Sequence, residues 1–184
     1  MFEIEIKARV RDMKSLRQAL IAAGCVFASP VTQKDRIFVP VTVSEFPVPS
    51  GVNVLRVREQ NGKFEVNLKQ PRTNELDCLE VEFPAEKPEQ IFEMFRILGF
   101  KEFSRVSKVR EKGKLRDLVV CLDAVEGLGE FIELEKMAES GDPVSLQEEL
   151  FKILKEFGVT EKDQVNHGYD ILLMEKGIDG GFPR

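Results

Sequence analysis

The first residues of the chain, MFEIEIKARV, alternate strictly between apolar and charged side chains. Alternation with a period of two predicts a β-strand that has one apolar face and one charged face. Taken alone, such a strand is most often a surface strand whose charged face lies in water. The pattern bears on function only if other strands repeat it in an organised way.

The same alternation predicts strands in eight segments, which are residues 2–10, 33–40, 53–60, 63–70, 77–84, 105–112, 116–124 and 130–136. Asn61-Gly62 lies between two of them and is a strong signal for a β-hairpin. Gly113 predicts a second, looser hairpin. The segment from Cys25 to Gly51 is rich in proline, which predicts an edge strand and loop rather than central sheet.

Capping residues and apolar spacing predict helices between the strands. Three helices open at Asp12, Pro88 and Asp142 and end at Gly24, Gly99 and Gly158, and a short fourth helix covers residues 169–175. The first three carry apolar stripes that need a surface to cover.

The charged faces of the predicted strands are sorted by sign. The carboxylates are Glu3, Glu5, Glu80, Glu82, Asp123, Glu133 and Glu135. The basic residues are Lys7, Arg56, Arg58, Lys69, Lys108 and Arg110. A solvent-exposed face usually mixes the two signs. The sorting, repeated over several strands, therefore favours a binding site over a solvated surface.

Each sign suits a different ligand. Carboxylate oxygens bind hard cations such as Mg²⁺ or Mn²⁺, and the chain has a single histidine, so a softer metal is not indicated. Arginine and lysine suit phosphate oxygens. The ligand that needs both sets is a metal-bound polyphosphate.

For these charges to converge, the sheet should curve into a barrel, and about eight strands close around one small ligand. The alternative is an ordinary barrel with apolar residues inside. The three apolar helix stripes favour aliphatic side chains outside and charge inside. The predicted fold is thus α+β, an eight-stranded antiparallel β-barrel tunnel with a charged interior and helices packed on the outside.

Length and composition set the remaining limits. At 184 residues the chain fits one domain, residues 1–184. It has no apolar run near the roughly 20 residues of a membrane helix and no signal-peptide pattern, so we expect a cytoplasmic protein that does not bind membranes. The net charge of −5 argues against a nucleic-acid partner. Cys25, Cys78 and Cys121 are odd in number and widely spaced, so we expect core residues rather than disulfides or a zinc site.

At this level of detail the chain resembles the CYTH superfamily, the triphosphate tunnel metalloenzymes. The resemblance lies in the ordered motifs ExExK at Glu3, RxR in LRVRE, the lone Lys69, ExE at Glu80, KxR in VSKVRE, and LDAVEGLGEFIELE. The superfamily includes class IV adenylyl cyclases, thiamine triphosphatases and inorganic triphosphatases. ExExK alone would be weak, but the ordered set is specific and covers most of the chain.

The resemblance implies a role for each matching residue. It assigns divalent metal, Mg²⁺ or Mn²⁺, to the carboxylates Glu3, Glu5, Glu80, Glu82, Asp123, Glu133 and Glu135. It assigns the triphosphate to Lys7, Arg56, Arg58, Lys69, Lys108 and Arg110, and it places Glu5, Lys7 and Glu135 at the reacting centre. Arg9, Glu65 and Lys112 are left out as rim or solvent charges.

Three departures from the family pattern leave questions open. The strand QKDRIFVP has Asp35 displaced from the usual position, so the role of residues 33–40 is open. Cys78 stands where many relatives have a basic residue. Gly168 stands where relatives have a serine, directly before Tyr169. The role of Tyr169 is also open, and core packing is favoured for it. For His167 a capping or surface role is favoured.

The resemblance implies a metal-dependent enzyme of the class IV adenylyl cyclase type, which converts ATP to cyclic AMP and pyrophosphate. The alternative is a triphosphatase that hydrolyses inorganic triphosphate, thiamine triphosphate or a nucleoside triphosphate. A second alternative, from another class, is a non-catalytic module that binds polyphosphate or nucleotide. The partner is in each case a small molecule that contains a triphosphate, and the oligomeric state is open, with a homodimer among the options.

Overall fold

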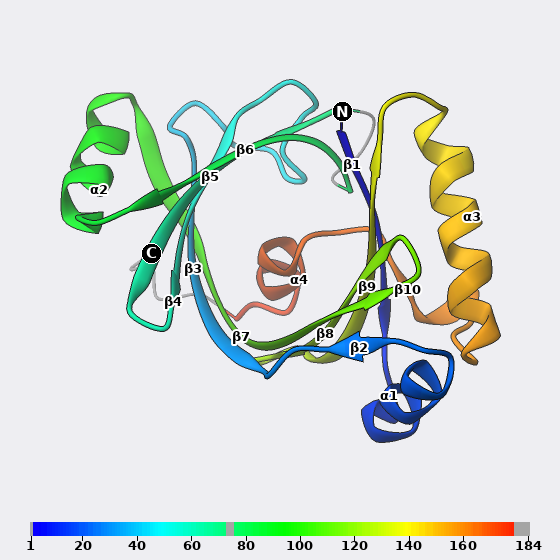
Figure 1. The fold of residues 1–184 in the computed structure, drawn as a ribbon. Helices are drawn as coiled ribbons and strands as arrows, with labels where there is room; N and C mark the ends of the chain where they lie inside the picture. Colours follow the sequence, from blue (N-terminus) through cyan, green and yellow to red (C-terminus); the bar gives the residue numbers. More distant parts are fainter. Residues whose placement is uncertain (1, 73–75, 179–184) are drawn as a thin grey trace.

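The computed structural model describes residues 2–72 and 76–178. Eight long strands form a closed antiparallel barrel in the order β1-β6-β5-β4-β3-β7-β8-β9, and β9 pairs again with β1 (Figure 1). The strands are β1 Phe2–Arg9, β3 Val31–Pro40, β4 Val54–Gln60, β5 Lys63–Pro71, β6 Asp77–Ala85, β7 Phe100–Leu115, β8 Leu118–Val125 and β9 Gly129–Ala138. Two short strands, β2 Val26–Phe27 and β10 Gln164–Val165, add to β7 and β1. The predicted barrel is confirmed.

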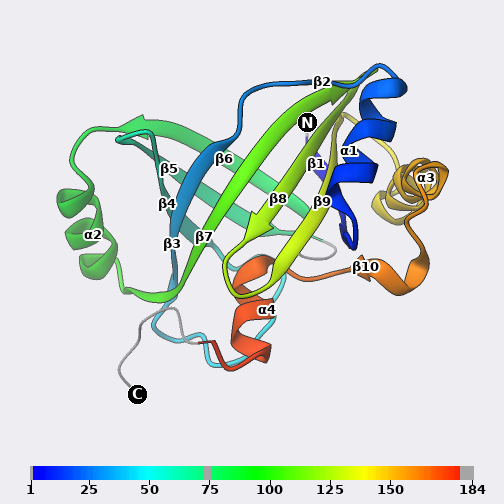
Figure 2. The ribbon, with the colours of Figure 1, turned by 90° about the horizontal axis from the view of Figure 1, so that it is seen from below.

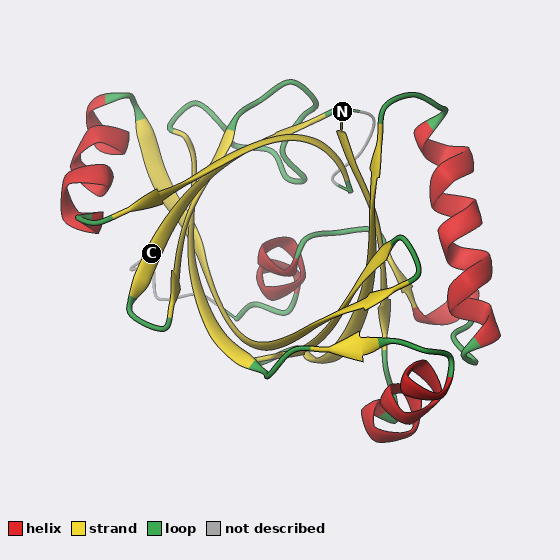
Figure 3. Ribbon diagram, in the orientation of Figure 1, coloured by secondary structure: helices red, strands yellow, loops and turns green. Residues whose placement is uncertain are grey.

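Three helices cover the outside of the barrel (Figure 3). They are α1 Met13–Ala22, α2 Pro88–Ile97 and α3 Pro143–Glu156. The carboxylates of Asp12 and Asp142 accept the backbone N–H of Ser15 and Ser145 and so cap α1 and α3 as predicted. A single turn of 3₁₀ helix, Glu161–Asp163, precedes β10.

The aliphatic parity of the strands packs beneath these helices. Ile4 and Ile6 of β1 are buried in one cluster with Leu150 and Leu154 of α3. Val57 and other residues of β3, β4 and β5 form a second cluster with α2. Because successive side chains of a strand point to opposite faces, the charged parity must face the lumen. The arrangement with aliphatic side chains outside and charge inside is confirmed.

The fourth helix, α4 Tyr169–Glu175, lies at one end of the barrel. Viewed along the barrel it covers the middle of the lumen (Figure 1), and viewed from the side it lies below the strands (Figure 2). Its residues Tyr169, Leu172 and Leu173 pack against inward-facing Ile37 and Val106, among other apolar residues of one cluster. An apolar plug thus fills this end of the lumen, next to the charged layers.

The expected hairpin at Gly113 is wrong. Strand β7 continues through this residue to Leu115, and the turn to β8 lies at Arg116 and Asp117, where Arg116 has a positive φ of 58°. Gly113 instead pairs with Phe27 of β2. A Cβ atom there would lie 2.5 Å from Cδ1 of the Phe27 ring, so the glycine allows close packing and not a turn.

The expectation of an edge strand and loop between Cys25 and Gly51 is right for residues 41–51, which are loop, and wrong for residues 31–40. Strand β3 pairs with β4 on one side and with β7 on the other, so it lies within the barrel wall. Pro30 precedes the strand and Pro40 ends it, so neither proline removes a hydrogen bond from the middle of the ladder.

The three cysteines are buried and free, as expected of core residues. Within the described residues we find no helix with both the length and the apolar character needed to cross a membrane.

Candidate metal and phosphate site

The lumen holds a cavity of about 240 Å³. Every residue assigned to metal or triphosphate from the sequence lines it, with the exception of Asp123. The lining includes Glu3, Glu5, Lys7, Arg56, Arg58, Lys69, Glu80, Glu82, Lys108, Arg110, Glu133 and Glu135. Strands from all around the barrel therefore contribute charges to one space.

The strand pair β1–β9 places carboxylates opposite one another. Glu5 lies directly across from Glu135, and Glu3 lies two residues before Glu5 on the same face of β1. Burial raises the pKa of Glu3 to about 7, with the charges of Glu135 and Glu80 acting in the same direction. Like charges on directly opposed positions destabilise a sheet unless something neutralises them.

Glu5 is similarly short of positive charge. Its Oε1 atom lies 3.1 Å from Nζ of Lys7, an ion pair by distance, but the geometry of a hydrogen bond is not met and the atom is otherwise unpartnered. Burial, followed by the charge of Glu133, raises the pKa of Glu5. Glu3 and Glu5 thus lack positive charge around them, and carboxylate oxygens are the donors that suit a hard divalent cation such as Mg²⁺ or Mn²⁺.

Arg56 and Lys108 carry the opposite imbalance. Nε of Arg56 is buried without a hydrogen-bond partner, and burial together with the charge of Arg58 lowers the pKa of the Arg56 guanidinium. Burial and the charge of Arg110 lower the pKa of Lys108 to about 8. These two groups lack sufficient negative charge around them, so this part of the cavity fits an anion.

The other basic residues of the cavity are held by carboxylates. Arg58 donates two hydrogen bonds to Asp35, at 2.8 and 2.7 Å, and although burial opposes the effect this pair lowers the pKa of Asp35 to about 2. Lys69 forms an ion pair of 2.5 Å with Glu80. These pairs hold the two cations toward the cavity in fixed positions.

Arg110 is a buried cation with three carboxylates around it. It donates to Oδ1 of Asp123 at 2.7 Å, pairs with Glu133, and lies 3.5 Å from Glu135. Asp123 is fully buried and also lies 3.3 Å from Nζ of Lys108. Asp123 thus sits behind the cavity wall rather than on the cavity surface. It pairs with Arg110 and offsets only part of the charge of Lys108, whose pKa stays lowered.

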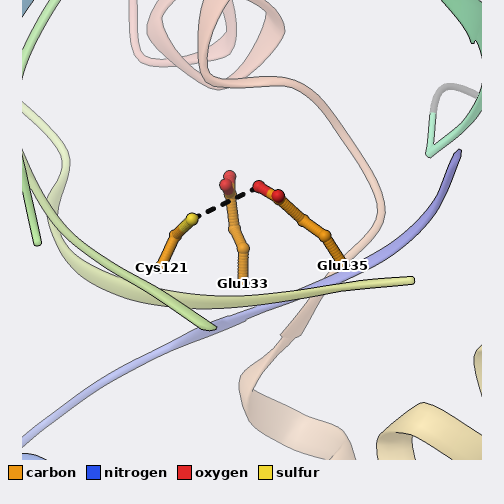
Figure 4. A group of neighbouring side chains, drawn as sticks. All are labelled: Cys121, Glu133 and Glu135. Carbon is orange, nitrogen blue, oxygen red and sulfur yellow. Dashed lines mark hydrogen bonds between the residues drawn. The ribbon is translucent and has the colours of Figure 1, made fainter. Parts of the chain in front are cut away.

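Cys121, Glu133 and Glu135 each bring one ligand atom within 4.8 Å of the others, close enough to hold one ion (Figure 4). The thiol donates to Oε1 of Glu135 at 3.3 Å, and burial raises its pKa strongly. Glu133 is engaged by Arg110 and by Lys7, whose Nζ lies 3.2 Å away. The guanidinium of Arg110 already pairs with both glutamates of this group, so a metal ion bound here would compete with it.

Three residues of the site could not be given a role from the sequence. Asp35 lines the cavity and pairs with Arg58, Asn67 donates to Glu80 at 2.9 Å, and the hydroxyl of Tyr169 donates to Asp123 at 2.9 Å. The parity of Asp35 and Asn67 on their strands was the signal that could have identified them. Nothing in the sequence placed Tyr169 inside the barrel.

The charges set aside as rim residues lie toward the edge of the site. Lys112 is 60% exposed in its side chain and lies 3.7 Å from Glu135 at the cavity mouth. Arg9 is exposed, and its guanidinium stacks over the ring of Phe131. His167 is half-buried just before α4, and its carbonyl oxygen accepts a hydrogen bond from Lys7 at 3.4 Å.

Known proteins are similar to this chain in both sequence and fold. A protein of Methanocaldococcus jannaschii named "Putative adenylate cyclase MJ0240" is 31% identical over 172 residues, which cover 92% of this chain and 97% of that protein. The solved structure of the PH1819 protein from Pyrococcus horikoshii is 30% identical, with a TM-score of 0.78 over 95% of this chain and 99% of the other.

A more distant structure, described as an adenylyl cyclase-like protein from Hippeastrum with a dominant triphosphatase activity, is 20% identical and has a TM-score of 0.58 over 96% of each chain. At this identity the likeness shows the fold alone. The sequence model of the CYTH domain matches residues 1–169. That match spans the barrel and reaches the first residue of α4, and we conclude that the chain belongs to the CYTH domain family.

Proposed function

We propose that this protein is a divalent-metal-dependent enzyme that cleaves a triphosphate bound in the tunnel. The observation that carries the proposal is the pair of opposite charge imbalances in one cavity. Glu3 and Glu5 need a cation, and Arg56 and Lys108 need an anion. A metal-bound triphosphate satisfies both, whereas a simple anion or a free cation satisfies one and worsens the other.

The basic residues would bind the phosphate chain. Arg56, with its unpartnered Nε, and Lys108 supply the strongest uncompensated positive charge. Arg58, Lys69 and Arg110 already hold fixed positions through their carboxylate partners, so their donors need little reorganisation when charge develops on the leaving group. Positioning and charge stabilisation of this kind account for most of the rate in phosphoryl transfer.

The carboxylates would divide into three roles. Glu3 and Glu135 would hold the metal together with Glu80 and Glu82, and the bound metal would polarise phosphate oxygens. Glu5, with its raised pKa and its position beside Lys7, is placed to accept a proton from the attacking oxygen. Asp123 and Glu133 would act through Arg110, which they hold in place.

The size of the cavity favours hydrolysis. Pockets that enclose a drug-sized ligand usually measure roughly 300–1,000 Å³, whereas this cavity measures about 240 Å³ and α4 fills one end of the lumen. A triphosphate chain fits this space, and an attached organic group would remain at the mouth. Water would then attack the terminal phosphorus, so that inorganic triphosphate and organic triphosphates both serve as substrates.

Adenylyl cyclisation is the second candidate. It is supported by the similarity to the Methanocaldococcus protein, which covers nearly the whole chain and carries the name of an adenylate cyclase. This reaction requires the ribose inside the site, because the 3′-hydroxyl must reach the α-phosphorus. The six charged positions of the basic set would serve either reaction.

Product analysis separates these candidates. The protein is incubated with ATP, tripolyphosphate or thiamine triphosphate in Mg²⁺ or Mn²⁺, and the products are resolved by chromatography. We expect orthophosphate with ADP or pyrophosphate, which marks hydrolysis. Cyclic AMP with pyrophosphate would instead establish the cyclase, and binding of these compounds without any product would establish a non-catalytic module.

A further inference from the structure

Tyr169 lies at the inner end of the cavity, where the charged layers meet the apolar plug. Its side chain comes from the first turn of α4 and is 6% exposed. The ring packs edge-on against Phe131, with the centroids 5.0 Å apart, and the hydroxyl donates to Oδ2 of Asp123 at 2.9 Å. Both ends of the side chain are therefore fixed.

Two ammonium groups face the ring of this tyrosine. Nζ of Lys7, from β1, lies 4.4 Å from the ring centroid, and Nζ of Lys108, from β7, lies 4.9 Å from it. Both distances are within the range of a cation–π interaction, which strengthens when the groups are shielded from water, as these are. One ring thus contacts two lysines that come from different parts of the barrel wall.

Both lysines have carboxylates within reach that compete with a ligand. Lys7 lies 3.1 Å from Glu5 and 3.2 Å from Glu133, and Lys108 lies 3.3 Å from Asp123. Without the ring, each ammonium group could move closer to its carboxylate partners and away from the cavity. The Tyr169 hydroxyl also keeps Lys108 from moving toward Asp123, because it supplies that carboxylate with a neutral hydrogen-bond donor.

We propose that Tyr169 is a positioning residue for phosphate binding: its ring keeps the ammonium groups of Lys7 and Lys108 directed at the ligand, and its hydroxyl orients Asp123 against Arg110. The proposal rests on the proposed function, since it assumes that the cavity binds a triphosphate. It gives α4 a role in ligand binding in addition to filling the end of the barrel.

Two substitutions separate the ring from the hydroxyl. Tyr169→Leu removes both, and we expect its affinity for tripolyphosphate at saturating Mn²⁺ to fall about tenfold or more, since a buried cation–π contact is lost at each of two lysines. Tyr169→Phe keeps the ring, and we expect it to restore most of that loss, to within about threefold of the unmodified protein. Calorimetry measures these affinities.

Leu173→Ala is the matched control for loosening of the helix. Leu173 packs in the same plug cluster, but its aliphatic side chain offers no aromatic ring to the lysines. We expect this variant to lower the unfolding temperature while its affinity for tripolyphosphate stays above that of Tyr169→Leu. The proposal is overturned if Tyr169→Phe and Leu173→Ala both lose as much affinity as Tyr169→Leu, because helix packing would then place the lysines.

The unmodified protein offers an independent readout. The chain contains no tryptophan and one tyrosine, so its tyrosine fluorescence reports on Tyr169 alone. Because the ligand changes the charge beside the ring, we expect tripolyphosphate with Mn²⁺ to change this emission at the concentration at which calorimetry detects binding. Binding with unchanged emission contradicts the role of Tyr169, whereas absence of any binding contradicts the proposed function instead.

Discussion

Glu3 carries a charge that the surrounding residues of the tunnel do not stabilise. Its pKa is raised from 4.5 to about 7, chiefly by burial. The folded protein therefore holds a proton on Glu3 at a pH where the unfolded chain has released it. This contribution favours folding at low pH and is lost as the pH rises from about 4.5 through about 7, with a total change on the order of 3 kcal/mol.

Replacement of Glu3 by glutamine should therefore stabilise the metal-free protein. In a chelator at about pH 8 we expect the free energy of unfolding of Glu3→Gln to exceed that of the unmodified protein by about 1–3 kcal/mol, and the difference to shrink at about pH 5. Chemical denaturation at both pH values measures it. Glu130→Gln, at an exposed position of β9, is the control.

The same substitution should weaken metal binding. We expect Mn²⁺ to raise the unfolding temperature of Glu3→Gln less than that of the unmodified protein. A variant that is less stable in chelator at the higher pH, yet keeps its full response to Mn²⁺, would exclude Glu3 from the metal site.

Arg56 and Arg110 both line the cavity, yet removing the first should chiefly lower ligand affinity and removing the second should chiefly lower stability. Arg56→Met removes a buried cation that lacks sufficient negative charge, so we expect tripolyphosphate affinity at saturating metal to fall about 10- to 100-fold with little loss of stability. Arg110→Met leaves Asp123 and Glu133 without their shared partner, so we expect the free energy of unfolding to fall by about 3–5 kcal/mol.

Calorimetry and chemical denaturation of the two variants measure these effects. If Arg56→Met were the strongly destabilised variant, the assignment of uncompensated charge to Arg56 would be wrong.

Among the elements, strand parity was the part of the fold most readable from the sequence. The alternation of Ile4 and Ile6 with Glu3, Glu5 and Lys7 fixed which face of β1 meets the helices. Asp35 has the parity of a lumen residue on its strand, but its displacement from the family pattern left its role open. The plug could not be predicted, because a single tyrosine in a seven-residue helix carries no signal for which barrel end it enters.

Gly113 shows how a residue can give a wrong signal when its role depends on a contact distant in the sequence. A glycine between two alternating segments normally indicates a turn, but this glycine is required by contact with Phe27, which lies far away in the sequence. We expect Gly113→Ala to lower the free energy of unfolding by about 1–3 kcal/mol through overpacking. Thermal or chemical denaturation measures this loss.

The double variant Gly113→Ala with Phe27→Leu should recover part of the loss, because the smaller side chain leaves room for the new methyl group. An alanine variant as stable as the unmodified protein would mean that β2 does not press on β7 at this point.

At the scale of the whole molecule, the barrel gathers charges of both signs in one cavity and pairs many, but not all, of them with one another. Glu3 and Glu5 of β1 lack positive charge around them, and Arg56 of β4 and Lys108 of β7 lack negative charge. Under the proposed function, the cavity would be preorganised for a ligand that carries a cation and an anion together. Metal and triphosphate should then bind with positive cooperativity, since each neutralises charge that opposes the other.

Measuring this coupling tests most directly whether the cavity binds a metal and a triphosphate together. A methylene-bridged triphosphate analogue, which resists hydrolysis, is titrated calorimetrically into the protein in chelator and again in Mn²⁺. The account predicts one site, with an affinity at least about tenfold higher in Mn²⁺, a coupling of about 1.4 kcal/mol or more. Equal affinity with and without the metal, or no binding in either condition, would contradict it.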